Sequence, residues 1–438
     1  MVSNAEISAS SLSITNILQD ALYKTMLLRP PVAPAWKSTF LRPASIQCRT
    51  SCFHTLRQNN PNPRLNNARQ FPSKTATATA TPSYPYLHHG VRSIPWGTRR
   101  LSTALPAVLV PPVVFVGLAL TLWFYKCCMM VIFQNKIIYM PSIPPFSRAE
   151  KIEDYEKACR PVIWEEKRIR SLDGTQIALC VGSVEGASHL QTGIDAQGTS
   201  GKRKHVVVLY FQGNASSLPP RLPLLSAPLK ILSKTNPLQT DYTIVALSYR
   251  GYWTSRGRAS QNGLELDALA ALRWVENTYV QDPAHTRLIL WGQSIGAGVA
   301  TGLLQQNLSS KTPPVKVNGV ILETPFVNTR SMLAALYPQK WLPYRYLWPF
   351  LRSWWDSEGA LRAVAQSKPG KDLPILIISA AKDEIVPEEQ ADYLEKLTRG
   401  LGFDVRRKDV SGSLHTEATI RAEGREAVVT FLRSAGEG

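Results

Sequence analysis

The feature that most constrains the fold is LILWGQSIGAGVATGLL at residues 288–304. It begins as an apolar strand and ends as a small-residue helix, with Gly292 and Gly296 flanking Ser294 between them. A sharp strand-to-helix turn needs glycines there, because a side chain would collide with the strand or the helix. The pattern predicts a turn that lifts the Ser294 hydroxyl out of a buried sheet. The alternative is a glycine-rich helix start that serine caps incidentally.

A serine hydroxyl is a weak nucleophile unless a histidine accepts its proton and a carboxylate orients that histidine. After such a turn the expected chain order is serine, acid, histidine. His415 is the only histidine after Ser294, and Asp383 follows the apolar run in LPILIISAAKDEIVP at 373–387, with Glu384 beside it. We therefore predict that Ser294, Asp383 and His415 are catalytic. The alternative interpretation of either carboxylate is an ordinary solvated loop residue.

Backbone N–H donors that stabilise an oxyanion are the remaining requirement of this chemistry. One expected donor is Ile295, directly after the serine. A second is Asn214, in the loop QGNAS that follows the apolar run VVVLYF. The alternative for this second loop is a plain strand-to-helix turn.

Short β-branched runs alternate with helical patterns from about residue 136 onward. The strand candidates are 168–170, 176–181, 206–211, 242–248, 287–291, 317–322, 374–379 and 404–410. An opening hairpin followed by strand–helix alternation predicts an α/β fold, with a mostly parallel sheet covered by helices on both faces. The insertion around 185–204 has the composition of a surface loop.

An uncharged stretch runs from Ala104 to Tyr125, and apolar character resumes after Lys126 through Phe133. This length suffices to cross a bilayer as a helix. We expect one transmembrane helix within 104–133, followed by the catalytic domain at 134–438, whereas a buried helix is the alternative. Basic residues on both flanks leave the orientation open.

The N-terminal extension, residues 1–103, carries much of the formal net charge of +18. Its first hundred residues hold twelve Lys or Arg and only two acids, Glu6 and Asp20, and they are rich in Ser and Thr. This composition predicts disorder and is typical of a mitochondrial presequence. We expect a single-pass membrane protein. A presequence would place it in the mitochondrial inner membrane, and the endoplasmic reticulum and plasma membrane are the alternatives if residues 1–103 are a plain disordered tail.

The basic charge does not indicate a nucleic-acid partner, because the chain contains no nucleic-acid-binding motif. The cysteines Cys48, Cys52, Cys127, Cys128, Cys159 and Cys180 have no metal-site spacing. We therefore predict neither a metal nor another cofactor.

Further motifs accompany the serine turn: FQNKIIYMPSIPP at 133–145, YFQGNASS at 210–217, YRGYWTSRG at 249–257, ETPFVN at 323–328 and WWDS at 354–357. With them the chain from about Phe133 onward resembles an α/β-hydrolase. More narrowly, it resembles the membrane-anchored branch that includes fungal bud-emergence-type hydrolases and animal depalmitoylases or lysophospholipases. The resemblance implies a serine hydrolase acting on lipid-derived acyl groups.

Several positions depart from the pattern of that branch. Gln212 occupies the place of a histidine in the oxyanion loop, Trp253 stands where glycine is usual, and Ala380 replaces a glycine before the acid. Two residues rather than one separate Gly412 from His415. We expect these departures to change a supporting side-chain hydrogen bond and the placement of the histidine loop, and to leave the backbone donors in place.

An aromatic segment from Tyr337 to Trp355 falls where this fold inserts a lid, at about 330–357. We expect a pair of aromatic helices there, with Trp341, Trp348 and Trp354 lining an acyl pocket or entering the membrane interface. Packing on the domain's own core is the alternative.

The expected reaction is hydrolysis of carboxylic esters or thioesters through an acyl-enzyme. The expected substrates and partners are S-acylated proteins or lysolipids at a membrane. A catalytically silent membrane scaffold and a peptidase of the same fold are the alternatives.

Overall fold

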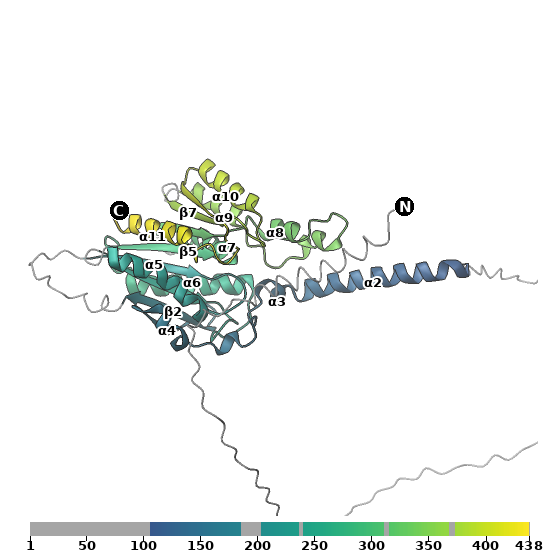
Figure 1. The fold of residues 1–438 in the computed structure, drawn as a ribbon, viewed down its shortest axis with the longest axis horizontal. Helices are drawn as coiled ribbons and strands as arrows, with labels where there is room; N and C mark the ends of the chain where they lie inside the picture. The colour runs from purple at the N-terminus through teal and green to yellow at the C-terminus, as the bar shows by residue number, and fades with distance from the viewer. Residues whose placement is uncertain (1–105, 185–202, 236–239, 311–314, 368–372, 438) are drawn as a thin grey trace, which may run out of the picture. The chain divides into compact units, whose positions relative to one another are not determined.

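The computed structural model describes residues 106–184, 203–235, 240–310, 315–367 and 373–437. Its centre is one sheet, whose strands are drawn as arrows in Figure 1. The sheet has eight strands in the order β1-β2-β4-β3-β5-β6-β7-β8. The strands are β1 Val162–Arg170, β2 Gln176–Val184, β3 Lys204–Phe211, β4 Thr240–Ser248, β5 Thr286–Gln293, β6 Gly319–Glu323, β7 Pro374–Ala380 and β8 Asp404–Val410. Strands β3 to β8 run parallel, whereas β2 is antiparallel to both β1 and β4. The predicted hairpin and mostly parallel sheet are confirmed.

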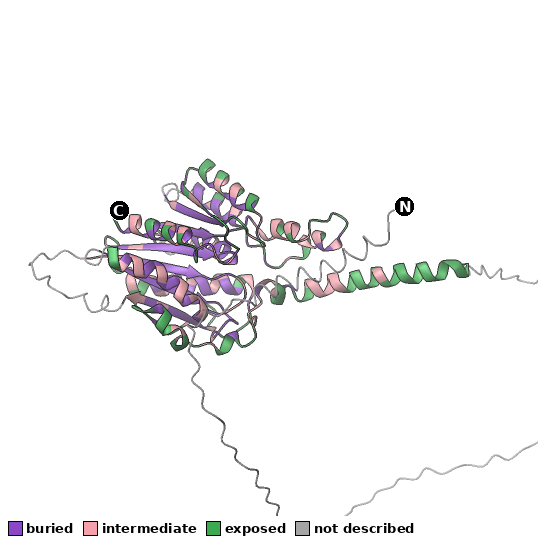
Figure 2. Cartoon of the chain, in the orientation of Figure 1, coloured by how far each residue is buried: buried purple, intermediate pink, exposed green. Residues whose placement is uncertain are grey.

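Helices cover both faces of this sheet. They are α4 Glu156–Cys159, α5 Leu222–Thr235, α6 Gln261–Tyr279, α7 Ile295–Ser309, α9 Ser357–Gln366, α10 Glu388–Gly400 and α11 Ala422–Glu437. A further helix, α8 Thr329–Leu336, begins the lid region. Apolar side chains of α5 and α11 form one buried core, and those of α6, α7, α9 and α10 form the other. Figure 2 shows buried residues along the strands between these helices.

Strand β3 shows why the sheet is central. Val206, Val208 and Tyr210 pack into the α5/α11 core, whereas Val207 and Leu209 pack into the opposite core. Successive side chains of a strand point to opposite faces, so a continuous apolar run is buried on both sides. This arrangement fixes the strand ends, where the candidate site residues lie.

The apolar segment forms α2, Val110–Ile132, followed by the short α3, Gln134–Tyr139. Together with the preceding turn, Ala107–Ile132 is long and apolar enough to cross a membrane, and none of its most apolar window is buried against the protein. The extension 1–103 and most of the insertion at 185–204 lie outside the described residues, so their interpretations stay predictions.

The lid region differs from the expected pair of aromatic helices. After α8, the chain forms only short 3₁₀ turns at Pro343–Tyr346 and Trp348–Phe350. Proline occupies the first or second position of each turn. A proline favours such starts but lacks the N–H that a longer helix would use, so the segment folds as successive tight turns.

Candidate active site

Ser294 lies between β5 and α7 with φ 52° and ψ −117°, a backbone conformation that side chains rarely adopt. A Cβ on Gly292 would lie 2.2 Å from the carbonyl oxygen of Gly296, and one on Gly296 would lie 2.1 Å from that of Phe211. Both glycines are therefore required sterically. The N–H of Ser294 donates to the carbonyl oxygen of Glu323 over 2.8 Å, which ties the turn to β6.

Asp383 and His415 are in direct contact. Nδ1 of His415 lies 2.8 Å from Oδ2 and 3.0 Å from Oδ1 of Asp383. Oδ1 also accepts the N–H groups of Ile385 and Val386 over 2.9 and 2.8 Å, which fixes the carboxylate. With Nδ1 facing the carboxylate, Nε2 is the ring nitrogen left for a substrate-side proton.

Glu384, the neighbouring carboxylate, occupies a different position. Its Oε2 accepts the backbone N–H of His415 over 3.0 Å, and it makes no hydrogen bond with the imidazole ring. Glu384 therefore holds the histidine loop, whereas Asp383 holds the ring. The structure therefore distinguishes the roles of two adjacent acids, whereas the chain order alone allowed either to orient the histidine.

Ser294 and His415 lie beyond the carboxyl ends of parallel strands, at the same edge of the sheet, but no hydrogen bond joins them in this structure. Nε2 of His415 is buried and has no partner among the described residues. Only 9% of Ser294 and 2% of His415 is exposed, so both side chains are shielded from solvent. Catalytic hydrogen bonds are often long in a free enzyme and shorten around substrate.

The predicted oxyanion donors flank the serine turn. A Cβ on Gly213 would lie 3.6 Å from Cβ of Ser294, so the loop carrying Asn214 passes beside the serine. Within the described part of the chain, the backbone N–H groups of Asn214 and Ile295 have no hydrogen-bond partner. The next N–H along the loop, that of Ala215, donates to the carbonyl oxygen of Tyr139 over 3.0 Å. The C-terminal end of α3 thus fixes this loop.

Gln212 lies where the resemblance expects a histidine. Its side-chain oxygen and nitrogen are buried without a partner among the described residues, while its carbonyl oxygen accepts the hydroxyl of Tyr249 over 2.9 Å. The Gln212 side chain therefore makes no hydrogen bond that supports the loop. The bond from Tyr249 to the Gln212 carbonyl supports it instead.

A buried polar network behind the serine escaped the sequence analysis. Glu323, fully buried, accepts the indole N–H of Trp291 over 3.0 Å, the amide of Gln293 over 3.2 Å and the hydroxyl of Thr419 over 2.8 Å. Burial raises the pKa of the Glu323 carboxyl, and the nearby Arg221 guanidinium opposes that shift. The network joins the serine turn to the segment after His415. ETPFVN was the only sequence signal for it.

The lid tryptophans occupy two different environments. Trp341 is exposed and stacks near Trp123 of α2, with ring centroids 5.9 Å apart. Trp348 lies beneath the guanidinium of Arg330 at 4.1 Å and edge-on to Trp354 at 6.4 Å. No hydrogen bond or ring contact joins these side chains to Ser294, so their role as an acyl pocket stays a prediction. In the described residues, no three His, Cys, Asp or Glu side chains cluster as metal ligands would.

Comparisons with known proteins identify this architecture. A family model for the α/β-hydrolase fold matches residues 264–419. The protein bem46 of Schizosaccharomyces pombe is 30% identical over 42% of this chain and 53% of its own length. The lysophosphatidylserine lipase ABHD12 of Danio rerio is 34% identical over 42% of this chain and 44% of its own. The chain thus spans about half the length of these relatives.

A solved α/β-hydrolase from Vibrio vulnificus has the same fold. It superposes with a TM-score of 0.50 at 19% identity, covering 69% of this chain and 92% of that structure.

Proposed function

Because this chain has the α/β-hydrolase fold, we propose that it is a membrane-tethered serine hydrolase of lipid-derived esters or thioesters. The observation that carries the proposal is the arrangement at one edge of the sheet: Ser294 on a strained, glycine-enclosed turn, and His415 oriented by Asp383. A buried histidine–aspartate pair with a free Nε2 is what activation of a serine requires.

The proposed reaction begins when Nε2 of His415 accepts the proton of the Ser294 hydroxyl as its oxygen attacks the substrate carbonyl carbon. Asp383 stabilises the imidazolium, and the N–H groups of Asn214 and Ile295 donate to the oxyanion. The imidazolium then returns the proton to the leaving alkoxide or thiolate, which leaves an acyl group on Ser294. Water, deprotonated by His415, attacks this ester, releases the carboxylic acid and restores the serine.

Lipid-derived acyl groups are proposed as substrates on three grounds. The relative from Danio rerio is a lysophosphatidylserine lipase. A helix able to span a bilayer precedes the domain directly. The aromatic segment beside that helix exposes Trp341, Phe350 and Trp354. Aromatic rings of this kind favour acyl chains and membrane interfaces.

Membrane tethering through α2 is testable without a substrate. The full chain should resist carbonate extraction, and deletion of residues 1–132 should release an active soluble domain. The cut keeps Gln134, whose amide donates to the carbonyl oxygen of Phe350 over 3.0 Å and whose Oε1 accepts the N–H of Arg352. Release of the full chain by carbonate would contradict the tether.

The proposed chemistry is tested by profiling the purified full chain on short and long acyl esters, S-acyl peptides and lysophospholipids. We expect turnover to rise with acyl length and to disappear in Ser294→Ala. Absence of turnover together with absence of labelling by a fluorophosphonate would favour the silent scaffold. Cleavage of unmodified peptides alone would favour the peptidase.

A further inference from the structure

A basic pocket lies at the β1 edge of the sheet, away from Ser294. It has a volume of about 490 Å³ and opens to solvent at the turn between β1 and β2. Arg168 and Arg170 of β1 line it together with Arg256, from the loop that follows β4. Residues two apart on a strand share a face, so Arg168 and Arg170 project together.

The charge in this pocket is only partly neutralised. Arg168 pairs with Glu166 over 2.9 Å, and that carboxylate also accepts the hydroxyl of Thr254. In the part of the chain that the structure describes, the guanidinium groups of Arg170 and Arg256 have no acceptor. Two planar guanidinium groups facing one concavity suit a phosphate, whose oxygens accept paired N–H donors.

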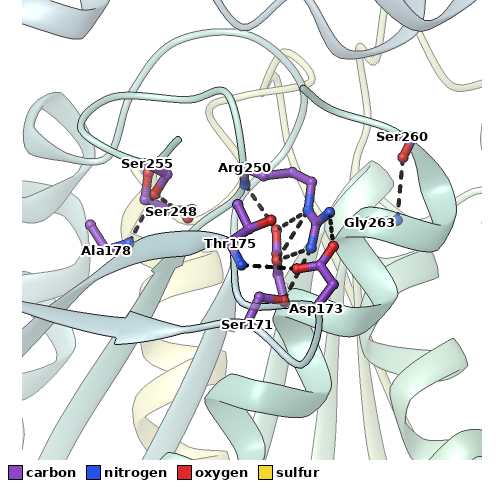
Figure 3. Close-up of polar contacts among 10 residues, drawn as sticks. Ser171, Asp173, Thr175, Ala178, Ser248, Arg250, Ser255, Ser260 and Gly263 are labelled. Atoms are coloured by element: carbon purple, nitrogen blue, oxygen red, sulfur yellow. Dashed lines mark hydrogen bonds and ion pairs between the residues drawn. The ribbon is translucent and has the colours of Figure 1, made fainter. Parts of the chain in front are cut away.

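The other acid nearby, Asp173, is already engaged by Arg250 over 2.6 Å (Figure 3). Arg250 also binds the fully buried Asp267 over 2.8 Å and the hydroxyl of Ser171 over 3.1 Å. The Arg250 guanidinium holds the pKa of the Asp173 carboxyl well below its ordinary value, so this acid stays ionised and paired. The basic pocket therefore keeps its positive charge.

The same ion network makes the pocket wall rigid. Arg250 ties the β1–β2 turn to the loop after β4 (Figure 3). The N–H of Arg256 donates to the carbonyl oxygen of Gln176 over 2.9 Å, which fixes the third arginine against β2. A Cβ on Gly257, where φ is +86°, would lie 3.1 Å from Thr175, so the loop packs closely on the turn. A preorganised site loses little entropy on binding an anion.

The loop of Arg256 also contacts the segment that follows the proposed membrane helix. A guanidinium nitrogen of Arg148 donates to the carbonyl oxygen of Gly251, and another donates to that of Ser255 over 3.2 Å. The indole N–H of Trp253 donates to the carbonyl oxygen of Glu150 over 2.7 Å.

This contact places the pocket near the expected lipid headgroups. The hydroxyl of Tyr252, in the same loop, donates to the carbonyl oxygen of Tyr139, and Tyr139 follows Ile132 by only seven residues, about 10 Å at the rise of a helix. The headgroup layer on each side of a bilayer core is roughly 5–8 Å thick. The segment that contacts the pocket loop therefore leaves the membrane close to the phosphates.

We propose that the pocket formed by Arg168, Arg170 and Arg256 binds the phosphate of an anionic phospholipid in the membrane that holds the anchor. Three strand spacings, about 14 Å, separate β2 from β5, so a lipid bound here is not the one undergoing cleavage. The bound lipid would orient the carboxyl ends of the parallel strands, beyond which Ser294 lies, toward the bilayer. The inference rests on α2 as the anchor, and not on the chemistry at Ser294.

The test uses the full chain in neutral detergent micelles and reads bound lipid by native mass spectrometry. The probes are ether-linked short-chain phosphatidic acid, the matching phosphatidylcholine and inorganic phosphate. Ether lipids contain no carboxylic ester, so binding is measured whether or not the protein is a hydrolase. Arg170→Gln/Arg256→Gln removes the unpaired charges. Arg399→Gln/Arg406→Gln removes equal charge from exposed sites at the opposite edge of the sheet.

We expect phosphatidic acid to bind and the Arg170/Arg256 double variant to weaken it roughly 30-fold, at about 1 kcal/mol for each arginine. The control variant should bind as the wild type does, and both variants should keep the wild-type melting temperature. Equal weakening in the two double variants, or none in the first, would overturn the site. If phosphatidylcholine binds as tightly as phosphatidic acid, the pocket does not recognise the negative charge of the headgroup. If inorganic phosphate binds as tightly as phosphatidic acid, the ligand of the pocket is free phosphate and not a lipid.

Discussion

Nδ1 of His415 lies 2.8 Å from Oδ2 of Asp383, with 3% and 6% of the two side chains exposed to solvent. The carboxylate is itself fixed by two backbone N–H donors. This geometry orients the ring so that Nε2 is the nitrogen available to a substrate or to Ser294. It also separates the role proposed for Asp383 from that of its neighbour, because Glu384 forms its hydrogen bond with the backbone N–H of His415 and not with the ring.

The two carboxylates should therefore respond differently to amide substitution. Asp383→Asn places an amide against Nδ1 and disfavours the required tautomer, so kcat should fall by about 10⁴-fold. Glu384→Gln keeps an oxygen for the N–H of His415, so kcat should fall less than about tenfold. Steady-state kinetics on one activated ester compares them. Equal losses, or the reverse ranking, would show that the acid is wrongly assigned.

Glu323 should contribute mainly to stability. Its carboxylate accepts three side-chain donors, so Glu323→Gln sets an amide N–H₂ against at least one of them. An unmet buried donor lowers the free energy of unfolding by about 1–3 kcal/mol. Urea denaturation measures this loss, and Glu389→Gln at an exposed site is the matched control. An unchanged denaturation midpoint in Glu323→Gln would refute the network as a structural tie.

The lid tryptophans should control acyl-chain preference. Each methylene buried against such rings contributes about 0.8 kcal/mol, so Trp348→Ala or Trp354→Ala should lower kcat/KM for long-chain esters far more than for acetyl esters. Trp355→Ala is the contrasting control, because Trp355 is fully buried and donates to the hydroxyl of Tyr139. It should lower the melting temperature and depress both activities together. Parallel losses in the lid variants would refute the pocket.

His205 should make stability depend on pH. Burial lowers its pKa from 6.5 to about 4, and its ring nitrogen lies 2.9 Å from the hydroxyl of Thr243. Between these values the unfolded chain binds a proton that the folded chain does not, so stability falls as pH decreases from about 6.5 to 4. Denaturation across this range should show a shallower decline in His205→Gln. Identical slopes would contradict the assignment.

Local patterns sufficed to predict the sheet and the serine turn. The strand at 404–410 has the predicted bounds, and the steric need for Gly292 and Gly296 follows from the turn itself. Strand β1 begins at Val162, six residues before the predicted 168–170. The prediction was too short because charged residues such as Glu166 and Arg168, which pair with each other, obscure the alternation of apolar and polar positions.

Other features depend on residues far apart in the chain. Glu323 accepts hydrogen bonds from residues 291, 293 and 419, and no local sequence pattern predicts that these residues contact one another. Trp355 is buried against Tyr139, whereas the adjacent Trp354 is 41% exposed. The aromatic run alone therefore did not distinguish core rings from lid rings.

The central claim is that Ser294 is the nucleophile, and covalent labelling tests it most directly. The full-length wild type and Ser294→Ala would be treated with a fluorophosphonate, digested and examined by mass spectrometry, with melting curves confirming that both are folded. We predict a single adduct on the peptide containing Ser294, and none in Ser294→Ala. Labelling of folded Ser294→Ala at the wild-type rate, or an adduct on another residue, would contradict it.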